Sequence, residues 1–486
     1  MRGVTRFIAL APLLSLSLVS PTGHAESPAA KGTSAAPASP ALSIETRAGM
    51  EQVLGAAMGS SRAFENLRTL TDTVGPRLAG SPGDRAAVAW ALETLTALGF
   101  SRVRAEKVAV PHWERGEESG ALVHPTLQPL ALTALGSSVP TPEAGLEAEV
   151  VEADSLEAVD ALGEKARGKI VLLWKLTERA RDGAGYGKTV ALRVSGASRA
   201  AKVGAIGVLV RSVSTADTRL PHTGDMHYEE GAPKIPGAAL STPDADLLHR
   251  LLQSGVTPRV RFRLSCRTLP DAESANVIGE IRGREKPDEI VVLGAHLDSW
   301  DLGTGAVDDG AGCVTMIEAA RIIGAMTRRP RRTLRVVLYA NEENGARGAK
   351  AYVIAHEKEL GLHVAALEAD SGAGPAYGFT YSTGPGSGGR LQEIAALLAG
   401  IGAGELKDGG NGGTDIAPLR AAGVPLFGVR QDASKYFDVH HSADDTLDKV
   451  DRRDLDSGVA LAAVLAYALA DLPEPLARIA PEAKAP

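Results

Sequence analysis

VVLGAHLDSWDLGTGAVDDGAGC, residues 291–313, is the segment from which the architecture of the chain can be predicted. The apolar run Ile290–Leu293 is typical of a buried strand. A polar loop from His296 then leads to Asp308-Asp309-Gly310, where an apolar helix begins. Open α/β sheets hold ligands beyond the carboxyl ends of their strands in this kind of strand, loop and helix unit. A histidine two residues before an aspartate, with an acidic pair nearby, also suits a metal site.

The same alternation of apolar strands and amphipathic helices continues to the end of the chain. Strands alternating with helices indicate a mainly parallel or mixed sheet sandwiched by helices, an α/β fold. The expected strands, besides the one at Ile290–Leu293, are Leu334–Ala340, Ala365–Ala369 and Val424–Val429. The expected helices are Ala311–Met326, Ala346–His356, Arg390–Ile401 and Leu455–Leu472.

The first part of the folded chain shows helical spacing, and the character then changes near Gly120. Helices are expected at Arg62–Leu70 and Asp84–Leu98, followed by a strand at Val103–Val110. Residues 120–268 instead hold short β-branched runs separated by Gly and Pro, with one expected helix at Ser195–Val203. We therefore expect residues 44–119 and 269–486 to form one discontinuous domain, with a β-rich insertion at 120–268.

The N-terminal residues have the pattern of a secretory signal peptide. A basic start, Met1–Arg6, precedes the apolar run Phe7–Val19, and Gly23-His-Ala25 supplies small residues for cleavage. The pattern predicts removal of residues 1–25 and an exported, periplasmic or secreted protein. Residues 26–43 are rich in Ala, Pro and Ser and are expected to be a flexible linker. No later apolar run is long enough for a stable membrane insertion.

Composition argues against nucleic acid as a partner and leaves open whether the two cysteines form a disulfide. The 486 residues carry a formal net charge of −7 and no basic patch, so nucleic acid is not an expected partner. The two cysteines, Cys266 and Cys313, match neither a metal site nor a redox CxxC pair. They are either two small buried residues or a single disulfide.

Further acidic and histidine side chains follow the other expected strands. The strand at Leu334–Ala340 leads into Glu342 and Glu343, and the strand at Ala365–Ala369 leads into Asp370. His441 lies near the C-terminus in the segment KYFDVHHSADDT. If the strands are parallel, their carboxyl ends meet at one edge of the sheet. These groups would then converge with His296 and Asp308.

This set suits two divalent cations, and we expect two Zn²⁺ per chain. Zinc takes histidine nitrogen and carboxylate oxygen, and a pair of ions a few ångströms apart needs a shared carboxylate. Asp308 is the natural bridge. One ion would be held by His296, Asp370 and Asp308, and the other by Glu343, His441 and Asp308.

Two further carboxylates are expected to assist catalysis. Glu342 would be the general base, taking a proton from water between the ions and passing it to the leaving amine. Asp298 would hydrogen-bond the far ring nitrogen of His296 and thereby fix the tautomer of that ligand.

These motifs resemble the co-catalytic dizinc exopeptidases of the aminopeptidase Y and glutamate carboxypeptidase type. The resemblance rests on HLDS at 296–299, DDGAG at 308–312, the adjacent glutamates, ADS at 369–371 and HHS at 440–442, and it covers nearly everything after the linker. It implies the same ligands and base. It also implies a cis peptide between Asp308 and Asp309, a protease-associated insertion domain and a possible homodimer.

Substrate contacts and the direction of cleavage are less well determined by the sequence. His440 and Tyr436 are candidates for binding the oxyanion of the tetrahedral intermediate. Lys435 and Arg430 are candidate partners of a substrate carboxylate, and Asp415 is either structural or a partner of a substrate ammonium. The resemblance favours a dipeptidase or carboxypeptidase-like activity on dipeptides or short peptides. The alternatives are an aminopeptidase on the same scaffold, a non-catalytic receptor-like binding protein, and a single-zinc enzyme resembling glutaminyl cyclase.

Overall fold

The computed structural model describes residues 42–480. The expected signal peptide at 1–25, and the expected linker up to residue 41, lie outside the described residues. Leu42 is buried, and the Ser43 side chain accepts a hydrogen bond from the Thr46 amide, which caps the first helix. Among the described helices, none has both the length and the apolar character needed to cross a membrane.

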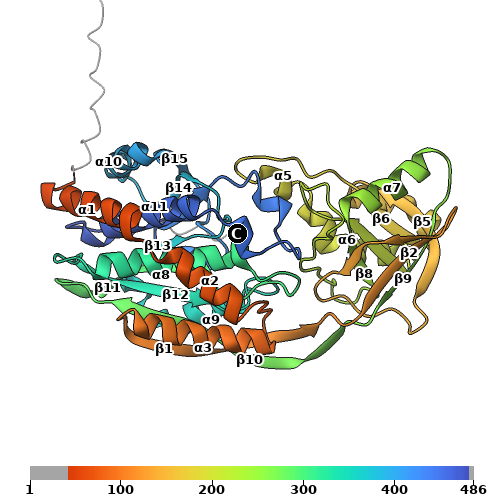
Figure 1. Cartoon of the computed structure of the whole chain (residues 1–486), viewed down its shortest axis with the longest axis horizontal. Helices are drawn as coiled ribbons and strands as arrows, with labels where there is room; N and C mark the ends of the chain where they lie inside the picture. Colours follow the sequence, from red (N-terminus) through yellow and green to blue (C-terminus); the bar gives the residue numbers. More distant parts are fainter. Residues whose placement is uncertain (1–41, 481–486) are drawn as a thin grey trace, which may run out of the picture. The chain divides into compact units, whose positions relative to one another are not determined.

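The sheet that carries the residues of interest has eight strands and is mixed (Figure 1). Its centre is parallel, because β11 pairs in parallel with β12 and β13, and β13 with β16. Its flanks are antiparallel at β10 and β14. In spatial order the strands are β1 (Ser101–Glu114), β10 (Arg267–Ile281), β12 (Arg332–Tyr339), β11 (Lys286–His296), β13 (His363–Glu368), β16 (Leu426–Gln431), β14 (Ala376–Ser382) and β15 (Glu405–Asp408).

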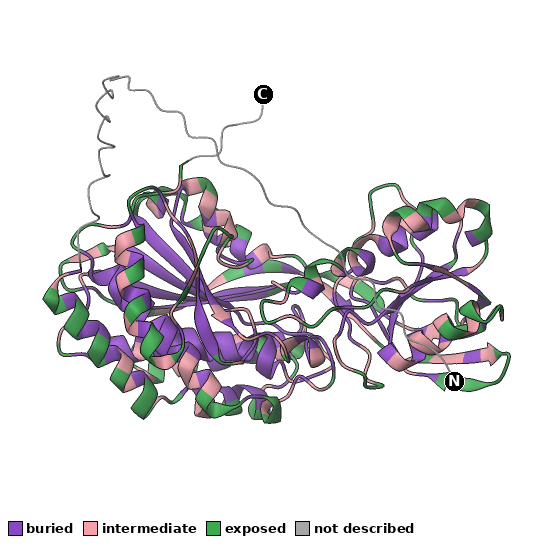
Figure 2. Ribbon diagram, turned by 90° about the horizontal axis from the view of Figure 1, so that it is seen from above, coloured by how far each residue is buried: buried purple, intermediate pink, exposed green. Residues whose placement is uncertain are grey.

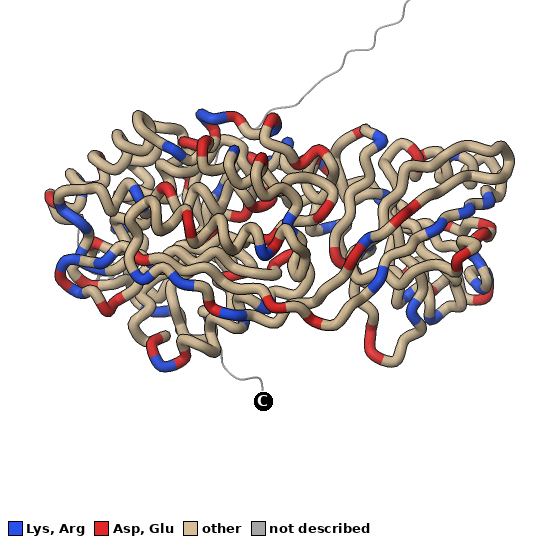
Figure 3. Tube along the Cα trace, turned by 60° about the horizontal axis from the view of Figure 1, so that its bottom comes forward, with Lys and Arg blue, Asp and Glu red and all other residues tan. Residues whose placement is uncertain are grey.

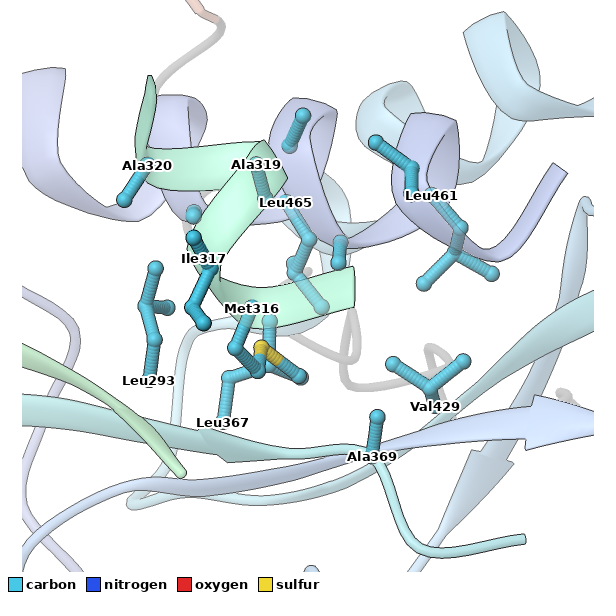
Figure 4. Close-up of a cluster of buried hydrophobic side chains, with 14 of the residues drawn as sticks. Leu293, Met316, Ile317, Ala319, Ala320, Leu367, Ala369, Val429, Leu461 and Leu465 are labelled. Atoms are coloured by element: carbon cyan, nitrogen blue, oxygen red, sulfur yellow. The ribbon is translucent and has the colours of Figure 1, made fainter. Parts of the chain in front are cut away.

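Helices cover both faces of this sheet, which confirms the predicted α/β sandwich. Alternate residues of the central strands point to opposite faces: Leu293 packs into one core cluster and Val292 into another. Figure 4 shows part of the first cluster, in which Met316 of α8 lies beside Leu367 of β13 and Leu461 of α11 lies over Val429 of β16. The central strands are buried along almost their whole length (Figure 2), so they read as unbroken apolar runs in the sequence.

Apart from α1, for which no range was predicted, the helices that pack against this sheet agree with the predicted ones to within a few residues. Ser81 and Asp451 cap two of them through their side chains. The helices are α1 (Ile44–Ser60), α2 (Ala63–Thr73), α3 (Pro82–Ala97), α8 (Ala311–Gly324), α9 (Arg347–Ala355), α10 (Gly388–Leu398) and α11 (Arg452–Asp471). The strands β10, β14 and β15 were not predicted, because their polar edge residues interrupt the apolar pattern.

A second sheet of eight strands is formed by residues 118–264. In spatial order its strands are β3 (Gln128–Leu130), β2 (Glu118–His124), β9 (Arg259–Leu264), β5 (Leu146–Ala153), β6 (Ile170–Leu173), β7 (Gly207–Arg211), β8 (Gly237–Leu240) and β4 (Leu132–Ala134). The expectation of a single helix here was wrong, since four are present: α4 (Leu156–Leu162), α5 (Ala184–Gly187), α6 (Val190–Lys202) and α7 (Thr242–Gln253). Serine caps at 155 and 241 start two of the missed helices and were the available signal.

The chain passes between the two sheets at adjacent points. It leaves the first sheet at the end of β1 and returns at the start of β10, and these two strands are antiparallel neighbours in which Glu114 pairs with Arg267. In the view of Figure 3, acidic and basic residues are interspersed along the trace without a large region of one sign.

The two cysteines are free, and both are buried. The Cys266 thiol donates to the Ser138 carbonyl oxygen at 3.1 Å, and the Cys313 thiol to the His296 carbonyl oxygen at 3.0 Å. The disulfide that the sequence left open is therefore not formed, and the first alternative, two small buried residues, is the correct one.

Candidate metal centre

Three neighbouring strand ends bring the expected ligands together. β11 ends at His296, β12 ends shortly before Glu343, and β13 ends two residues before Asp370. Because β12, β11 and β13 are adjacent and parallel, these three side chains emerge at the same edge of the sheet. Nε2 of His296 lies 3.8 Å from Oδ1 of Asp370.

Asp308 lies between His296 and His441, which are far apart in the sequence. It belongs to the tight turn Ala306–Gly310 that precedes α8. Its Oδ1 lies 3.2 Å from Nε2 of His296, and its Oδ2 lies 3.3 Å from Nε2 of His441. Nε2 of His441 is also 2.9 Å from Oε2 of Glu343. One carboxylate therefore faces both halves of the expected ligand set.

The donor set fits divalent cations. Ligand atoms of His296, Asp308 and Glu343 all lie within 4.8 Å of one another, as do those of Asp308, His440 and His441. Asp308 Oδ2 and Glu343 Oε1 are buried and accept no hydrogen bond, so both have lone pairs free for coordination. Nitrogen and carboxylate oxygen together are the donors that zinc takes.

The local charges show how strongly this cluster favours added positive charge. Although burial opposes it, the carboxylates of Glu343 and Asp308 raise the pKa of His441 to about 10. Burial favours the protonated form of Asp308, yet His296 and His441 hold the pKa of Asp308 well below its usual range. The buried carboxylates of this cluster thus carry more negative charge than the two histidines can neutralise. Bound divalent cations would supply the missing positive charge.

The neighbouring Asp309 has a different role. Its Oδ2 accepts from the His296 amide at 3.2 Å, and its Oδ1 accepts from the Gly312 amide at 3.1 Å. A Cβ at Gly312 would lie 2.2 Å from Oδ1 of Asp309, so this close contact requires glycine. The peptide between Asp308 and Asp309 is cis, as the resemblance implied.

Asp298 contacts His296 as expected, but through its backbone carbonyl and not through its carboxylate. Nδ1 of His296 lies 3.0 Å from the backbone carbonyl oxygen of Asp298, whereas the nearest carboxylate oxygen is 3.9 Å away. The Asp298 carboxylate instead accepts the backbone amides of Glu342 at 3.0 Å and Glu343 at 3.4 Å. A carboxylate bonds a backbone amide more strongly than a carbonyl does, so Asp298 holds the loop that carries the acidic pair.

Glu342 lies beside the cluster and remains partly exposed. Burial, together with the carboxylates of Asp370, Glu343 and Asp298, raises its pKa to about 8. Cations bound among these carboxylates would lower that pKa again, since an adjacent positive charge favours the ionised form. A group with this pKa response is suited to accept and release a proton near neutral pH.

His440 and Tyr436 flank the same cluster. The His440 ring stacks on His441 with 3.5 Å between ring centroids, and its Nε2 lies 3.5 Å from Oδ2 of Asp308. The Tyr436 ring meets His440 edge-on at 4.9 Å. Burial and the nearby carboxylates of Asp308 and Asp370 raise the pKa of Tyr436 well above its usual value, which keeps its hydroxyl a hydrogen-bond donor.

Comparison with known proteins identifies the family. The model of peptidase family M28 matches residues 276–466. Mouse carboxypeptidase Q is 38% identical over 418 residues, which cover 86% of this chain and 87% of that protein. Human carboxypeptidase Q is 37% identical over the same length. The chain belongs to peptidase family M28. It is therefore a hydrolase of peptide bonds.

Solved structures agree with this M28 assignment. A crystal structure of a peptidase M28 precursor from Shewanella amazonensis is 42% identical, has a TM-score of 0.87, and covers 90% of this chain and 99% of its own. A zinc aminopeptidase from Bacillus subtilis has a TM-score of 0.60 at 22% identity, with 83% of this chain and 93% of that chain covered, and so shares the fold.

Two residues at this M28 site were not foreseen from the sequence. One is Asp445, whose carboxylate accepts the backbone amides of Val307 at 2.6 Å and Asp308 at 3.2 Å. Burial, and then the nearby Asp308, raise the pKa of Asp445 to about 7. The signal was present, because Asp445 follows His441 in the motif HHSADDT, but no metal-ligand role required it.

The second is Arg77, which is completely buried. Its guanidinium donates to the carbonyl oxygens of Leu297 at 2.5 Å, Thr304 at 2.7 Å and Gly305 at 2.8 Å. It thus fastens the loop between His296 and Asp308 from the N-terminal part of the chain. Arg77 begins the segment RLAGSPG, residues 77–83, but no side-chain pattern indicates partners that are backbone carbonyl oxygens.

Replacing Arg77 by methionine is expected to destabilise the protein by about 3 kcal/mol or more, since buried carbonyl oxygens would lose their donors. The loop that presents Asp308 should also shift, so activity should fall further than stability alone explains. Urea unfolding and kcat measured on the same preparation would check this. An exposed control, Arg68→Met, should change neither quantity, and equal behaviour of the two variants would contradict the role given to Arg77.

Proposed function

We propose that the protein is an exported dizinc exopeptidase that hydrolyses dipeptides or short peptides in the manner of a dipeptidase or carboxypeptidase. The observation that carries this proposal is the position of Asp308, with one carboxylate oxygen facing His296 and the other facing His441. A carboxylate shared in this way is the hallmark of a two-metal site.

In this proposal His296 and Asp370 bind one ion, Glu343 and His441 bind the other, and Asp308 is shared. The short distances from His296 to Asp370 and from His441 to Glu343 support this division. When bound, two zinc ions would polarise the scissile carbonyl and acidify the attacking water. Glu342 would take the proton of that water and deliver it to the leaving amine. Tyr436 or His440 would donate a hydrogen bond to the oxyanion that develops.

Two hollows beside the site support a substrate with both ends charged. One, of about 820 Å³, reaches Val307 and Tyr436 and is lined by more acidic than basic groups. The other, of about 580 Å³, reaches Ser371 and is lined by Lys407 and Arg430 together with one carboxylate, Asp182. Acidic surroundings favour a substrate ammonium and basic surroundings favour a carboxylate. The similarity to carboxypeptidase Q also supports a carboxypeptidase-like activity.

We also infer that residues 120–268 form a protease-associated domain inserted into a peptidase domain made of residues 44–119 and 269–486. The second sheet, which begins at Glu118 and ends at Leu264, supports these boundaries. Export to the periplasm or beyond, with removal of residues 1–25, is proposed from the N-terminal pattern alone. The homodimer likewise stays a prediction.

The first experiment is zinc analysis of the purified chain, followed by a substrate panel. We expect two zinc equivalents and hydrolysis of a free dipeptide, with little hydrolysis of its N-acetylated or C-amidated forms. Cleavage of the amide and of an aminoacyl anilide would replace the proposal with an aminopeptidase, and cleavage of the N-acetylated form would indicate a carboxypeptidase. Fewer than two zinc ions and no turnover would contradict the dizinc proposal and favour a binding protein.

A further inference from the structure

A short segment of the second sheet's part of the chain, Pro221–Gly224, lies directly against the turn that carries His440 and His441. Nδ1 of His222 donates to the His440 carbonyl oxygen at 2.6 Å, and the Thr223 amide donates to the His441 carbonyl oxygen at 2.9 Å. His222 and Thr223 are both almost completely buried.

His441 needs external support, because its backbone is in an unfavourable conformation. Its φ is +60°, in the left-handed region that residues with a side chain rarely adopt. Such a conformation is unfavourable and persists where surrounding contacts enforce it. The bond from the Thr223 amide to the His441 carbonyl oxygen is one of these contacts.

The ring of His441 is also held from this side. Its Nε2 faces Asp308 and Glu343, which leaves Nδ1 pointing the other way, 3.3 Å from the Thr223 carbonyl oxygen. A histidine that coordinates through Nε2 carries its proton on Nδ1 and donates it to such an acceptor. This bond would fix both the tautomer and the direction of the ring.

Arg193 of α6 completes the arrangement. It is 6% exposed, and its Nη1 lies 3.5 Å from the Thr223 carbonyl oxygen and 3.4 Å from Nδ1 of His441. Its Nη2 donates to the Tyr186 hydroxyl at 2.9 Å. Among residues 42–480, no carboxylate forms an ion pair with Arg193 within 4.0 Å. Because Nδ1 of a metal-bound His441 carries a proton, the guanidinium donates to the Thr223 carbonyl oxygen and the Tyr186 hydroxyl and only lies beside that ring nitrogen.

The backbone is shaped to admit this guanidinium. A Cβ at Gly224 would lie 2.3 Å from Cζ of Arg193, and Gly224 has a φ of +136°. Thr223 is itself anchored, since its hydroxyl donates to the Ala134 carbonyl oxygen at 2.8 Å. The Thr223 carbonyl oxygen, which accepts from Nδ1 of His441, is therefore positioned by strand β4 and by α6. Both elements lie between residues 118 and 264, the part of the chain that forms the second sheet.

We propose that His222, the Thr223 carbonyl and Arg193 are positioning residues for the metal ligand His441, so that half of the metal site depends on the second sheet. The inference rests on the proposed function, because it takes His441 to be a ligand. Loss of this kind of support in other metal sites lowers metal affinity or activity by about 10- to 100-fold.

The test uses the full chain with His222→Ala and Arg193→Leu. Each variant is equilibrated with Co²⁺ or Zn²⁺ in a chelator-buffered solution. Weaker binding of one metal equivalent by about 10-fold or more is expected, with the other equivalent retained and an altered Co²⁺ visible spectrum. At limiting zinc, kcat should fall by a similar factor while KM changes little. His222→Asn keeps a donor at the position of Nδ1 and should restore most of the metal affinity.

Two matched variants separate this role from simple loss of stability. His249→Ala removes a histidine of α7 that contacts Glu152, and Arg199→Leu removes an arginine of α6 that contacts Asp160. Both should leave metal affinity unchanged. Metal affinities of the His222 and Arg193 variants equal to those of the controls, in protein with a normal unfolding transition, would overturn the proposal.

The outcome can be told apart from failure of the proposed function. If the unchanged protein binds two metal ions but cleaves no peptide in the panel, the exopeptidase proposal fails, and the Co²⁺ and Zn²⁺ affinities of the variants still decide the positioning role. If the unchanged protein binds no second metal ion, His441 has no ligand role and both proposals fail.

Discussion

Glu342→Gln is expected to lower kcat by about 10²- to 10⁴-fold while the protein keeps both zinc ions, because a glutamine cannot accept the proton of the attacking water. The side chain keeps its size, and the backbone amide of residue 342 can still donate to Asp298. KM should therefore change much less than kcat. Steady-state kinetics on the free dipeptide, with zinc analysis of the same sample, would check both halves of this expectation.

Glu343→Gln provides the contrast for this prediction. Glu343 contacts His441 and is proposed as a ligand, so its replacement should lower zinc content as well as kcat. The two adjacent glutamates would thus fail in different ways. If Glu342→Gln instead lost zinc, or kept a kcat within a few-fold of the unchanged enzyme, the assignment of Glu342 as general base would have to be abandoned.

Asp308→Asn is expected to reduce the zinc content to one equivalent or less and to reduce activity to the level of the metal-free protein. An amide has one acceptor oxygen in place of two and carries no charge, so it cannot bridge two cations. The two histidines that now face opposite oxygens of Asp308 would lose their common partner. Metal analysis after dialysis, and activity with and without added zinc, would measure the effect.

An exposed carboxylate away from the site gives the matched comparison for Asp308. Asp271 forms an ion pair with Arg347 on the surface, and Asp271→Asn should keep two zinc ions and full activity. The bridging role would be disproved by an Asp308→Asn protein that still binds two zinc ions with unchanged affinity. Restoration of activity by excess zinc alone would show that Asp308 contributes affinity but is not needed as a bridge.

The central strands and the residues at their ends could be predicted from the sequence for a simple physical reason. Strands buried on both faces are apolar throughout, and in a parallel sheet whatever follows them must meet at one edge. The spacing of His296, Glu343 and Asp370 relative to those strands was therefore enough to group them. The mixed flanks were not predicted, because β10 begins with a run of exposed polar residues and the apolar pattern of β14 is interrupted by Gly378 and Thr380.

Contacts made by backbone atoms could not be predicted in the same way. Asp298 binds two amides of the Glu342–Glu343 loop, and no side-chain pattern announces which amides a carboxylate will meet. Arg77 is similar, since all three hydrogen-bond partners of its guanidinium are carbonyl oxygens. The approach of His222 to His440 links positions more than two hundred residues apart, and only the folded chain brings them together.

The pairing of Glu114 with Arg267 has a consequence for how such a protein can arise and be re-engineered. Two residues that face each other across an antiparallel pair are where a hairpin turn would normally close, so residues 115–266 occupy the place of a turn. Closing a longer connection adds little entropic cost once its ends are held together. Residues 115–266 could thus be inserted or deleted without changing the register of β1 and β10. A protein without them would also lose the contacts of Thr223 and Arg193 with His441.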